Sequence, residues 1–237
     1  MNVDPTLAVI AGGLGKRLHP LTLSIPKSLV AVGGTAFIDH QLGLFARKGL
    51  KKVVFCLGHQ GELIRNHLGN TNCHGLDIHF SDDGKNLCGT GGAIFNALPL
   101  LGDEFLVTYG DSYLDIDYYH AFAAFRKSRQ PALMTVYRNK NRWDHSNVEF
   151  DGTRIRRYDK NNRSQAMTYI DFGLLVFHKD CFTKWQQTLA FDLADLLAQL
   201  AKESLLAGYE VHQRFYEIGS AKGLADLEAA FKAQGHT

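Results

Sequence analysis

Three glycines and three basic residues near the N-terminus form the strongest chemical signal in the sequence. They are Gly12, Gly13, Gly15, Lys16, Arg17 and Lys27. Glycines directly after a strand let the backbone approach a phosphate closely and point N–H groups at it. A plain strand-to-helix turn explains one or two glycines, but it does not explain three followed at once by cations that suit a polyanion. The stretch therefore predicts a loop that binds a phosphate chain.

Two well-known phosphate-binding loops do not fit this stretch. The dinucleotide fingerprint GxGxxG needs a glycine where Leu18 stands, and Pro20 interrupts the helix that should follow. The P-loop GxxxxGK[ST] needs a glycine at Ile10 and Ser or Thr at Arg17. These mismatches disfavour both a Rossmann oxidoreductase and a P-loop NTPase.

An acidic residue follows a buried strand further along the chain. Asp111 comes after the apolar run 105–109 and Gly110, and ligands of α/β proteins bind at the carboxyl ends of such strands. A role in ligand binding is the favoured interpretation of Asp111, and a helix N-cap is the alternative. The neighbouring Asp115 and Asp117 are interpreted as helix-start residues.

Alternating apolar patterns predict the elements that position these residues. Strands are predicted at 7–11, 53–57, 76–80 and 105–109, and helices at 37–49, 62–68, 91–98 and 118–125. Strand–helix–strand alternation at this spacing is typical of parallel βαβ units whose sheet is buried on both faces. The first half of the chain is therefore predicted to form a parallel sheet flanked by helices.

The pattern changes after Pro131. Strand-like runs joined by short polar turns occur at 133–137, 148–150, 155–158 and 169–177, and helical leucine stripes at 193–200 and 224–231. We expect the strands to be antiparallel additions to the same sheet. The predicted fold is one Rossmann-like α/β domain over residues 1–237, with a central, mostly parallel mixed sheet.

Composition excludes several classes of protein. In 237 residues, 26 basic and 24 acidic side chains leave a charge of +2, which gives no strong reason to bind nucleic acid or a membrane. No apolar run approaches the ~20 residues of a membrane span, and residues 1–5 lack the basic region of a signal peptide. Four distant cysteines suggest reduced thiols. We expect a cytoplasmic protein.

In order and spacing, several motifs resemble the sugar-1-phosphate nucleotidylyltransferases, also called NDP-sugar pyrophosphorylases. The matching stretches are 12–22 with 26–27, 89–93, 109–111, 159–160, 170–173 and 216–220. The sequence around these motifs is most similar to the branch of mannose- and heptose-1-phosphate guanylyltransferases. Three residues depart from the family pattern, namely Asp159 for Glu, Asp171 for Asn and Glu217 for Asp.

The resemblance implies the reaction NTP + sugar 1-phosphate ⇌ NDP-sugar + pyrophosphate, with roles for particular residues. The nucleotide would be bound in the half 1–130 by Ala11, Gly12, Gly13, Gly15, Lys16, Gly89, Thr90 and Gly91. The sugar phosphate would be bound in the half 131–237 by Asp159, Lys160, Asp171 and Gly173. Arg17, Lys27 and Asp111 would be catalytic, and Asp111 with Glu217 would hold Mg²⁺.

The resemblance leaves the substrate pair open. GTP with a mannose- or heptose-type 1-phosphate is the first choice. A uridylyltransferase, or an enzyme using CTP or dTTP, acting on another sugar or amino-sugar 1-phosphate is the alternative. A nucleotide-sugar-binding protein without catalysis is a third hypothesis. The expected partners are these small molecules, without nucleic acid or membrane, and relatives often associate as homo-oligomers.

Overall fold

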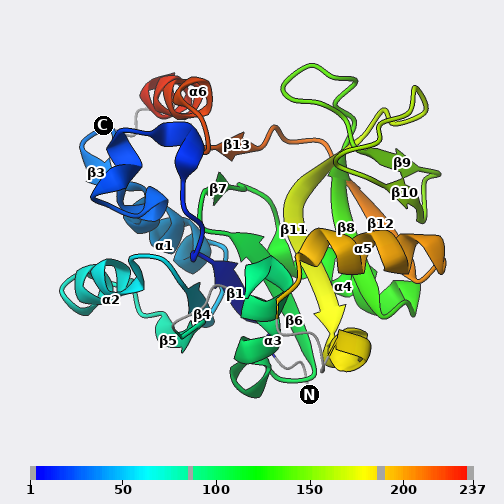
Figure 1. Cartoon of the computed structure of the whole chain (residues 1–237), viewed down its shortest axis with the longest axis horizontal. Coiled ribbons are helices and arrows are strands. Elements are labelled where there is room, and N and C mark those ends of the chain that lie inside the picture. Colours follow the sequence, from blue (N-terminus) through cyan, green and yellow to red (C-terminus); the bar gives the residue numbers. More distant parts are fainter. Residues whose placement is uncertain (1–3, 85–87, 186–189, 234–237) are drawn as a thin grey trace.

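The computed structural model describes residues 4–84, 88–185 and 190–233. Its centre is a seven-stranded sheet in the order β12-β8-β11-β6-β1-β4-β5 (Figure 1). The strands are β1 (Thr6–Ile10), β4 (Lys52–Leu57), β5 (Asp77–Asp82), β6 (Glu104–Tyr109), β8 (Ala132–Tyr137), β11 (Ile170–His178) and β12 (Leu206–Val211). Only β11 runs antiparallel to its neighbours, β6 and β8. The predicted mostly parallel mixed sheet is confirmed.

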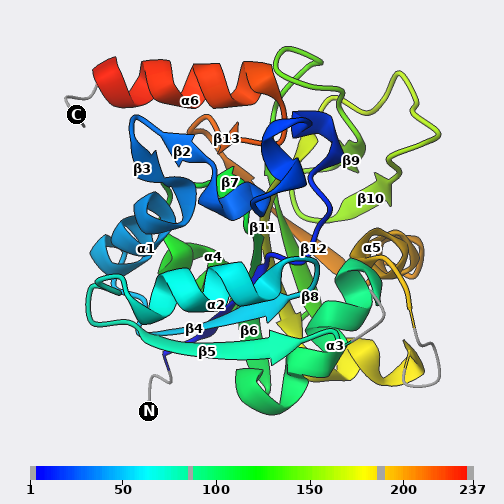
Figure 2. The same cartoon turned by 60° about the vertical axis from the view of Figure 1, so that its left-hand side comes forward.

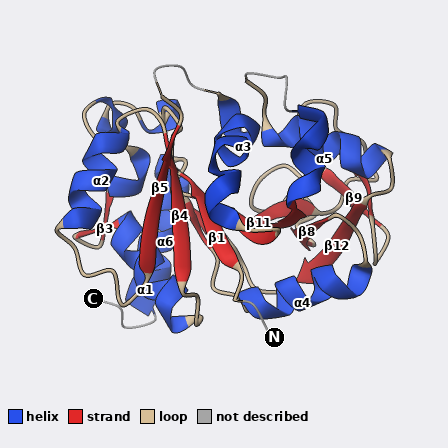
Figure 3. Ribbon diagram, turned by 90° about the horizontal axis from the view of Figure 1, so that it is seen from below, coloured by secondary structure: helices blue, strands red, loops and turns tan. Residues whose placement is uncertain are grey.

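Helices cover both faces of this sheet. They are α1 (Phe37–Arg47), α2 (Gly61–Gly69), α3 (Gly89–Leu101), α4 (Tyr118–Ser128) and α5 (Leu193–Lys202). Alternate residues of a strand point to opposite faces, so Ala8 of β1 packs with α3 and α5, whereas Leu7 packs with α1, α2 and α4. Figure 3 shows α3 and α5 on one side of the strands and α4 on the other.

The expectation for the second half of the chain was partly wrong. β9 (Val148–Phe150) and β10 (Ile155–Tyr158) do not extend the main sheet but form a separate antiparallel pair. The place beside β8 is taken by β12, which pairs with β8 in parallel along its whole length. Sequence reasoning missed β12 because Gly208 interrupts its apolar pattern.

The C-terminal helix packs against the N-terminal segment. Leu227 and Phe231 of α6 (Ala221–Ala233) join a small apolar cluster with Leu18, Val30 and Phe37. Figure 2 shows α6 running across the top of the molecule beside the pair β2 (Ala31–Val32) and β3 (Thr35–Ala36). The segment that carries the basic loop is therefore fixed by the other end of the chain.

Two expectations about the chain as a whole can be checked in the described residues. None of the helices there is long and apolar enough to cross a membrane. The four cysteines are free thiols, and burial raises the pKa of Cys88 to about 12. Buried thiols of high pKa are structural rather than reactive.

We expect Phe177→Ala to lower the free energy of unfolding by about 3–5 kcal/mol, because it removes a large side chain from a close-packed core. Phe177 is fully buried, and its ring centroid lies 5.4 Å from that of Phe182 and 6.2 Å from that of Phe105. Urea denaturation measures the change. Leu23→Ala, at a side chain that is 63% exposed, is the control; an equal loss in both variants would contradict the assigned core.

Candidate active site

The glycine-rich loop leaves β1 at the carboxyl edge of the sheet and is held by close backbone contacts. A Cβ atom on Gly12 would lie 2.9 Å from the backbone nitrogen of Gly58, so no side chain fits there. Gly15 adopts a left-handed conformation, with φ of 62°, and the hydroxyl of Thr22 donates a hydrogen bond of 2.8 Å to its carbonyl. Glycine is therefore required at both positions.

Most of the predicted nucleotide-binding residues surround one cavity of about 450 Å³. Its wall includes Gly12, Gly13, Gly15, Lys16, Arg17, Lys27, Gly89 and Thr90. The apolar side chains of Ile10, Leu14 and Ala93 complete it, together with two carboxylates that sequence reasoning did not select, Asp83 and Asp192. The cavity thus combines apolar surface with a cluster of cations.

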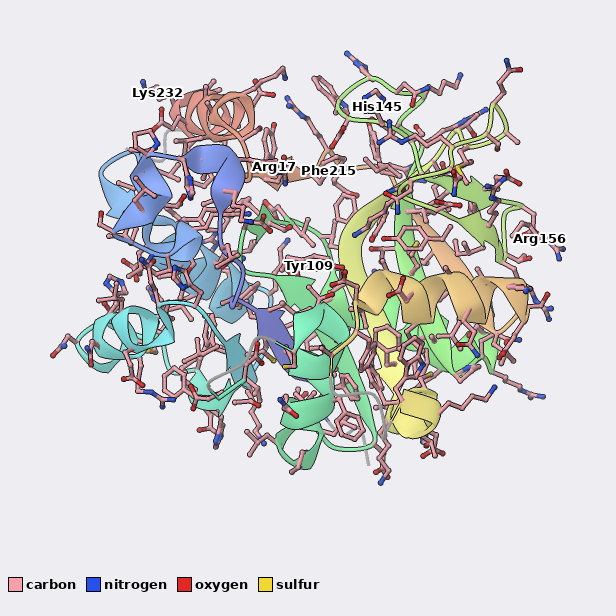
Figure 4. The ribbon with its side chains drawn as sticks, viewed as in Figure 1. Arg17, Tyr109, His145, Arg156, Phe215 and Lys232 are labelled. Atoms are coloured by element: carbon pink, nitrogen blue, oxygen red, sulfur yellow. The ribbon has the colours of Figure 1, made fainter. Side chains whose placement is uncertain are left out.

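Two further cavities adjoin the first. One of about 190 Å³ is lined by Ala11, Lys27 and Asp111, among others, and one of about 420 Å³ is lined by Lys160 and Asp192. Thr90 lines all three cavities, and Tyr109 lines the second and the third. In Figure 4, Tyr109 lies near the centre of the molecule, whereas Arg156 lies at its periphery. The two predicted halves of the site therefore meet around these residues.

Lys27 and Asp111 form an ion pair at this junction. The ammonium Nζ donates a hydrogen bond of 2.7 Å to Oδ2 of Asp111, and the two side chains are only 20% and 19% exposed. Partial burial makes such a pair stronger than one on the surface. The structure thus joins the basic loop directly to the end of β6.

A buried glutamine fixes the turn that carries Asp111. Gln41 of α1 is completely buried, and its Nε2 donates hydrogen bonds to the carbonyls of Tyr109 (3.1 Å) and Ser112 (2.8 Å). The backbone carbonyl of Asp111 accepts a further hydrogen bond of 2.9 Å from Ile218. Sequence reasoning missed Gln41, because a single polar residue within an amphipathic helix gives no signal of its own.

A short strand pair brings Glu217 close to Asp111. β7 (Ser112–Tyr113) and β13 (Tyr216–Glu217) are antiparallel, with Glu217 opposite Ser112. Burial raises the pKa of Glu217, and the negative charge of Asp111 raises it further. The guanidinium of Arg17 lies 3.7 Å from Glu217 and partly offsets this repulsion. The side chain of Arg17 is nevertheless 64% exposed, so it can turn toward a ligand.

The carboxylates of Asp111 and Glu217 suit one kind of metal ion. In the part of the chain that the structure describes, no group of three or more His, Cys, Asp or Glu side chains could hold a metal. Mg²⁺ is commonly bound by one or two carboxylates together with waters and substrate phosphates. The pair therefore fits a magnesium ion that is shared with a phosphate ligand, and does not fit a metal held by protein alone.

In the second half, the residues Asp159 and Lys160 both line the 420 Å³ cavity. The carboxylate of Asp159 accepts hydrogen bonds from the backbone N–H groups of Asn161 (2.9 Å) and Asn162 (2.7 Å). These bonds hold the pKa of Asp159 below its ordinary value and shape its own loop. Lys160 has its Nζ 5.9 Å from the ring centroid of Tyr158.

Asp171 is held from two sides. It accepts hydrogen bonds from the backbone N–H of Gly173 (3.0 Å) and from the hydroxyl of Tyr158 (3.3 Å). Burial raises the pKa of Asp171 despite the nearby charge of Lys160. Gly173, with φ of 101°, lies where β11 loses its register with β8. Tyr158 lines the 420 Å³ cavity, whereas Asp171 and Gly173 do not.

The glycines at the start of α3 are explained by packing. The N–H groups of Gly91 and Gly92 donate to the carbonyl of Phe191 at 2.9 and 3.3 Å. A Cβ atom on Gly91 would lie 2.2 Å from the ring of Phe191. Thr90 accepts a hydrogen bond of 2.8 Å from the N–H of Leu193, at the start of α5. Neither Gly91 nor Gly92 lines the 450 Å³ cavity, whereas Gly89 and Thr90 do.

Of the two other aspartates near Asp111, only Asp117 acts as expected for a helix-start residue. Asp117 caps α4 by accepting a hydrogen bond of 2.9 Å from the N–H of His120. Asp115 forms an ion pair with Lys48, at the end of α1. Neither lines the three adjoining cavities.

Comparison with known proteins gives consistent relatives. The profile of the family described as "Nucleotidyl transferase" matches residues 7–233. The N-acetylmuramate alpha-1-phosphate uridylyltransferase of Neisseria meningitidis is 36% identical over 48% of this chain, and the match covers only 50% of that protein. The D-glycero-alpha-D-manno-heptose 1-phosphate guanylyltransferase of Campylobacter jejuni is 24% identical over 89% of this chain and 93% of its own.

A solved structure with a similar fold is HddC from Yersinia pseudotuberculosis. It superposes with a TM-score of 0.80 at 21% identity and covers 96% of this chain and 99% of its own. This likeness confirms the predicted Rossmann-like arrangement of the sheet and its helices.

We expect Gln41→Leu to displace the Asp111 turn. The change removes the hydrogen bonds from Gln41 to the carbonyls of Tyr109 and Ser112, which should lower the free energy of unfolding by about 2 kcal/mol or more. Chemical denaturation measures this loss. Gln130→Leu is the control, because that side chain lies outside the core; equal effects in the two variants would contradict the clamping role of Gln41.

Proposed function

Because the chain belongs to the nucleotidyl transferase family, we propose that it transfers a nucleotidyl group from a nucleoside triphosphate to a sugar 1-phosphate. The products are an NDP-sugar and pyrophosphate. The observation that carries this proposal is the junction of Lys27 and Asp111 between a cation-rich cavity and the one lined by Lys160. Two polyanions bound in these cavities would meet at the junction.

The proposed chemistry needs no nucleophile from the protein. An oxygen of the sugar phosphate attacks the α-phosphorus of the triphosphate, and the bond from that phosphorus to the oxygen bridging to the β-phosphate breaks. Pyrophosphate leaves with the electron pair of that bond. Catalysis then consists of positioning the two reactants and stabilising the negative charge of the transition state.

Each cation has a proposed place in this reaction. Lys27, at the junction, contacts the α-phosphate as it is transferred. Arg17 and Lys16 hold the β- and γ-phosphates, because they lie on the loop side of the 450 Å³ cavity. Lys160 neutralises the phosphate of the sugar 1-phosphate from the opposite cavity. The bidentate geometry of Arg17 suits a pyrophosphate leaving group.

Asp111 and Glu217 are proposed to hold Mg²⁺. When bound, the ion supplies positive charge that neutralises phosphate oxygens. The ammonium of Lys27 donates a hydrogen bond to Oδ2 of Asp111. Arrival of the triphosphate gives Lys27 an alternative anionic partner, so the carboxylate becomes available as a ligand.

For the substrate pair, we propose GTP with a mannose- or heptose-type 1-phosphate. The support is the similarity to a heptose 1-phosphate guanylyltransferase, which extends over nearly the whole chain, together with the motif resemblance. Uridylyl transfer to another sugar phosphate is the second candidate, because the similarity to an N-acetylmuramate 1-phosphate uridylyltransferase is higher but covers half the chain.

The test of the reaction is a matrix of GTP, UTP, CTP and dTTP against hexose, hexosamine and heptose 1-phosphates, with pyrophosphate release as readout. We expect turnover in which one base dominates. Binding of nucleotide sugars without release of pyrophosphate from any pair would instead support a binding protein and overturn the proposed reaction. Comparable rates with all bases would overturn the choice of GTP.

We expect Lys27→Ala and Asp111→Asn each to lower kcat by at least ~100-fold, because each removes a preorganised charge at the reacting phosphate. Steady-state pyrophosphate release measures the effect, and thermal melting checks that the variants fold. Lys48→Ala, which removes another partly buried lysine of an ion pair, is the matched control and should keep near-normal turnover. Near-normal turnover in either test variant would exclude its proposed role.

Removal of divalent metal should abolish turnover, because the negative charge of the triphosphate is then under-neutralised. The measurement is pyrophosphate release after dialysis against EDTA, followed by addition of Mg²⁺. Full activity in the chelator would contradict the proposed role of Asp111 and Glu217.

A further inference from the structure

Arg214 is a cation to which the reaction gives no task, yet three segments of the chain converge on its guanidinium. The central carbon of that group lies 3.6 Å from the ring centroid of Trp143 and 4.6 Å from that of Tyr216. Its Nη2 donates a hydrogen bond of 2.6 Å to Oδ2 of Asp226. Trp143 belongs to the segment 138–147, between β8 and β9. Tyr216 belongs to β13 and Asp226 to α6. We call these four residues the Arg214 cluster.

The contacts of Arg214 need a flat, charged group. A guanidinium can stack on aromatic rings through its faces and form an ion pair through its edge, which an ammonium cannot do. Within the described residues, Nε of Arg214 and Nε1 of Trp143 are buried without a hydrogen-bond partner. Stacking and the ion pair with Asp226, rather than a hydrogen-bond network, therefore hold the Arg214 cluster together.

The Arg214 cluster lies directly beside Glu217. This residue follows Tyr216 in β13, a strand of only two residues. A Cβ atom on Gly223 would lie 2.2 Å from the carbonyl oxygen of Glu217, so α6 packs closely on the backbone of β13. Asp226 lies three residues later on the same helix. The ion pair of Arg214 with Asp226 therefore holds α6 against the strand that carries Glu217.

The carboxylate of Glu217 needs support because other negative charges lie near it. Asp111 and Asp144 repel it, whereas Arg17 and Lys27 attract it. Two carboxylates at a metal site repel each other until a cation is bound between them. β13 is paired with β7 through only two residue pairs, so its own hydrogen bonds offer little resistance. The separation of Glu217 from Asp111 therefore depends on the contacts that hold β13.

The segment 138–147 gives the Arg214 cluster a fixed point. Asn139 is buried, and its Oδ1 accepts a hydrogen bond of 3.1 Å from the N–H of Trp143. The N–H of Ser146 donates a bond of 2.8 Å to Oδ1 of Asn141, and the N–H of Asn141 donates one of 3.1 Å to Oγ of Ser146. The segment is thus tied to itself and presents the indole of Trp143 in a defined position.

We propose that Arg214 is a positioning residue, which holds Glu217 at the magnesium site by joining the segment 138–147, β13 and α6. The proposal rests on the proposed nucleotidyl transfer and deepens it, because it names what keeps the two metal-binding carboxylates together. Residues that orient a metal ligand without touching the metal commonly contribute about 10- to 100-fold to metal affinity.

The experiment measures binding of pyrophosphate by calorimetry, with and without Mn²⁺, in the wild type and in Arg214→Leu. Pyrophosphate is a product of every substrate pair, so the choice of base does not enter. The measured quantity is the factor by which Mn²⁺ strengthens binding of pyrophosphate. This factor should fall about 10- to 100-fold in Arg214→Leu, whereas affinity for metal-free pyrophosphate should stay the same.

Two results of this experiment would overturn the proposal. One is an unchanged factor in Arg214→Leu. The other is a wild type in which Mn²⁺ does not strengthen binding of pyrophosphate, since there would then be no metal site to position. If Arg214→Leu does not fold, as judged by thermal melting, Arg214→Lys takes its place. It keeps a cation for Asp226 but loses the flat group, and should show a smaller loss of the same kind.

The control is Arg126→Leu. Arg126 also stacks on a ring, with its central carbon 4.6 Å from the centroid of Phe122, and it also forms an ion pair, with Glu104. Glu104 begins β6, whereas Asp111 follows the end of that strand, so this pair lies at the opposite edge of the sheet. Arg126→Leu should keep the factor of the wild type.

A second substitution separates positioning from a general effect on the fold. In Glu217→Gln the carboxylate to be positioned is absent, so adding Arg214→Leu should lower the remaining factor no further. An equal loss with and without the Glu217 carboxylate would show that Arg214 acts on the fold as a whole, and would contradict the positioning role.

Pyrophosphate release distinguishes this inference from the proposed reaction. If the wild type turns over a sugar phosphate but Arg214→Leu needs no more Mg²⁺ for half-maximal turnover, the positioning role fails and the reaction stands. If Mn²⁺ strengthens binding of pyrophosphate in an Arg214-dependent way but no substrate pair releases pyrophosphate, the positioning role stands and the reaction fails.

Discussion

The ion pair between Lys27 and Asp111 is the interaction on which the arrangement of the site depends. Each side chain is about four-fifths buried, so removing either one leaves a poorly solvated charge. The pair ties the basic N-terminal segment to the end of β6. Lys27 is a cation suited to phosphate, and Asp111 is an anion suited to metal. In a complex with metal and triphosphate, a phosphate can replace Asp111 as the partner of Lys27, and the metal can replace Lys27 as the partner of Asp111.

The position of that ion pair depends on segments far apart in the chain. Gln41 of α1 holds the carbonyls on either side of Asp111, while Ile218 binds the carbonyl of Asp111 itself. The basic segment is fixed in turn by α6, through Leu18 and Val30. The acidic and basic halves of the junction are thus each clamped by elements that carry no reacting group.

Sequence reasoning located residues correctly in the fold where their position depends on local pattern. The loop glycines, the cations and Asp111 stand beside strands with clear apolar runs, so both their element and their edge of the sheet could be predicted. Gln41 and Asp83 could not, because an isolated polar residue acquires meaning only from what the fold brings to it. For the same reason the glycine at position 91 was assigned to ligand binding, although contact with Phe191, a hundred residues later, accounts for it.

The order of the strands explains why the cavities lie where they do. From β1 the chain moves outward through β4 and β5, and then returns to β6 on the other side of β1. The connections after β1 and β6 therefore diverge, and such a reversal opens a crevice at the carboxyl ends of the strands. Asp83 follows β5 and Lys160 follows β10, so separate loops carry them. Residues at one end of this crevice can consequently change without disturbing those at the other.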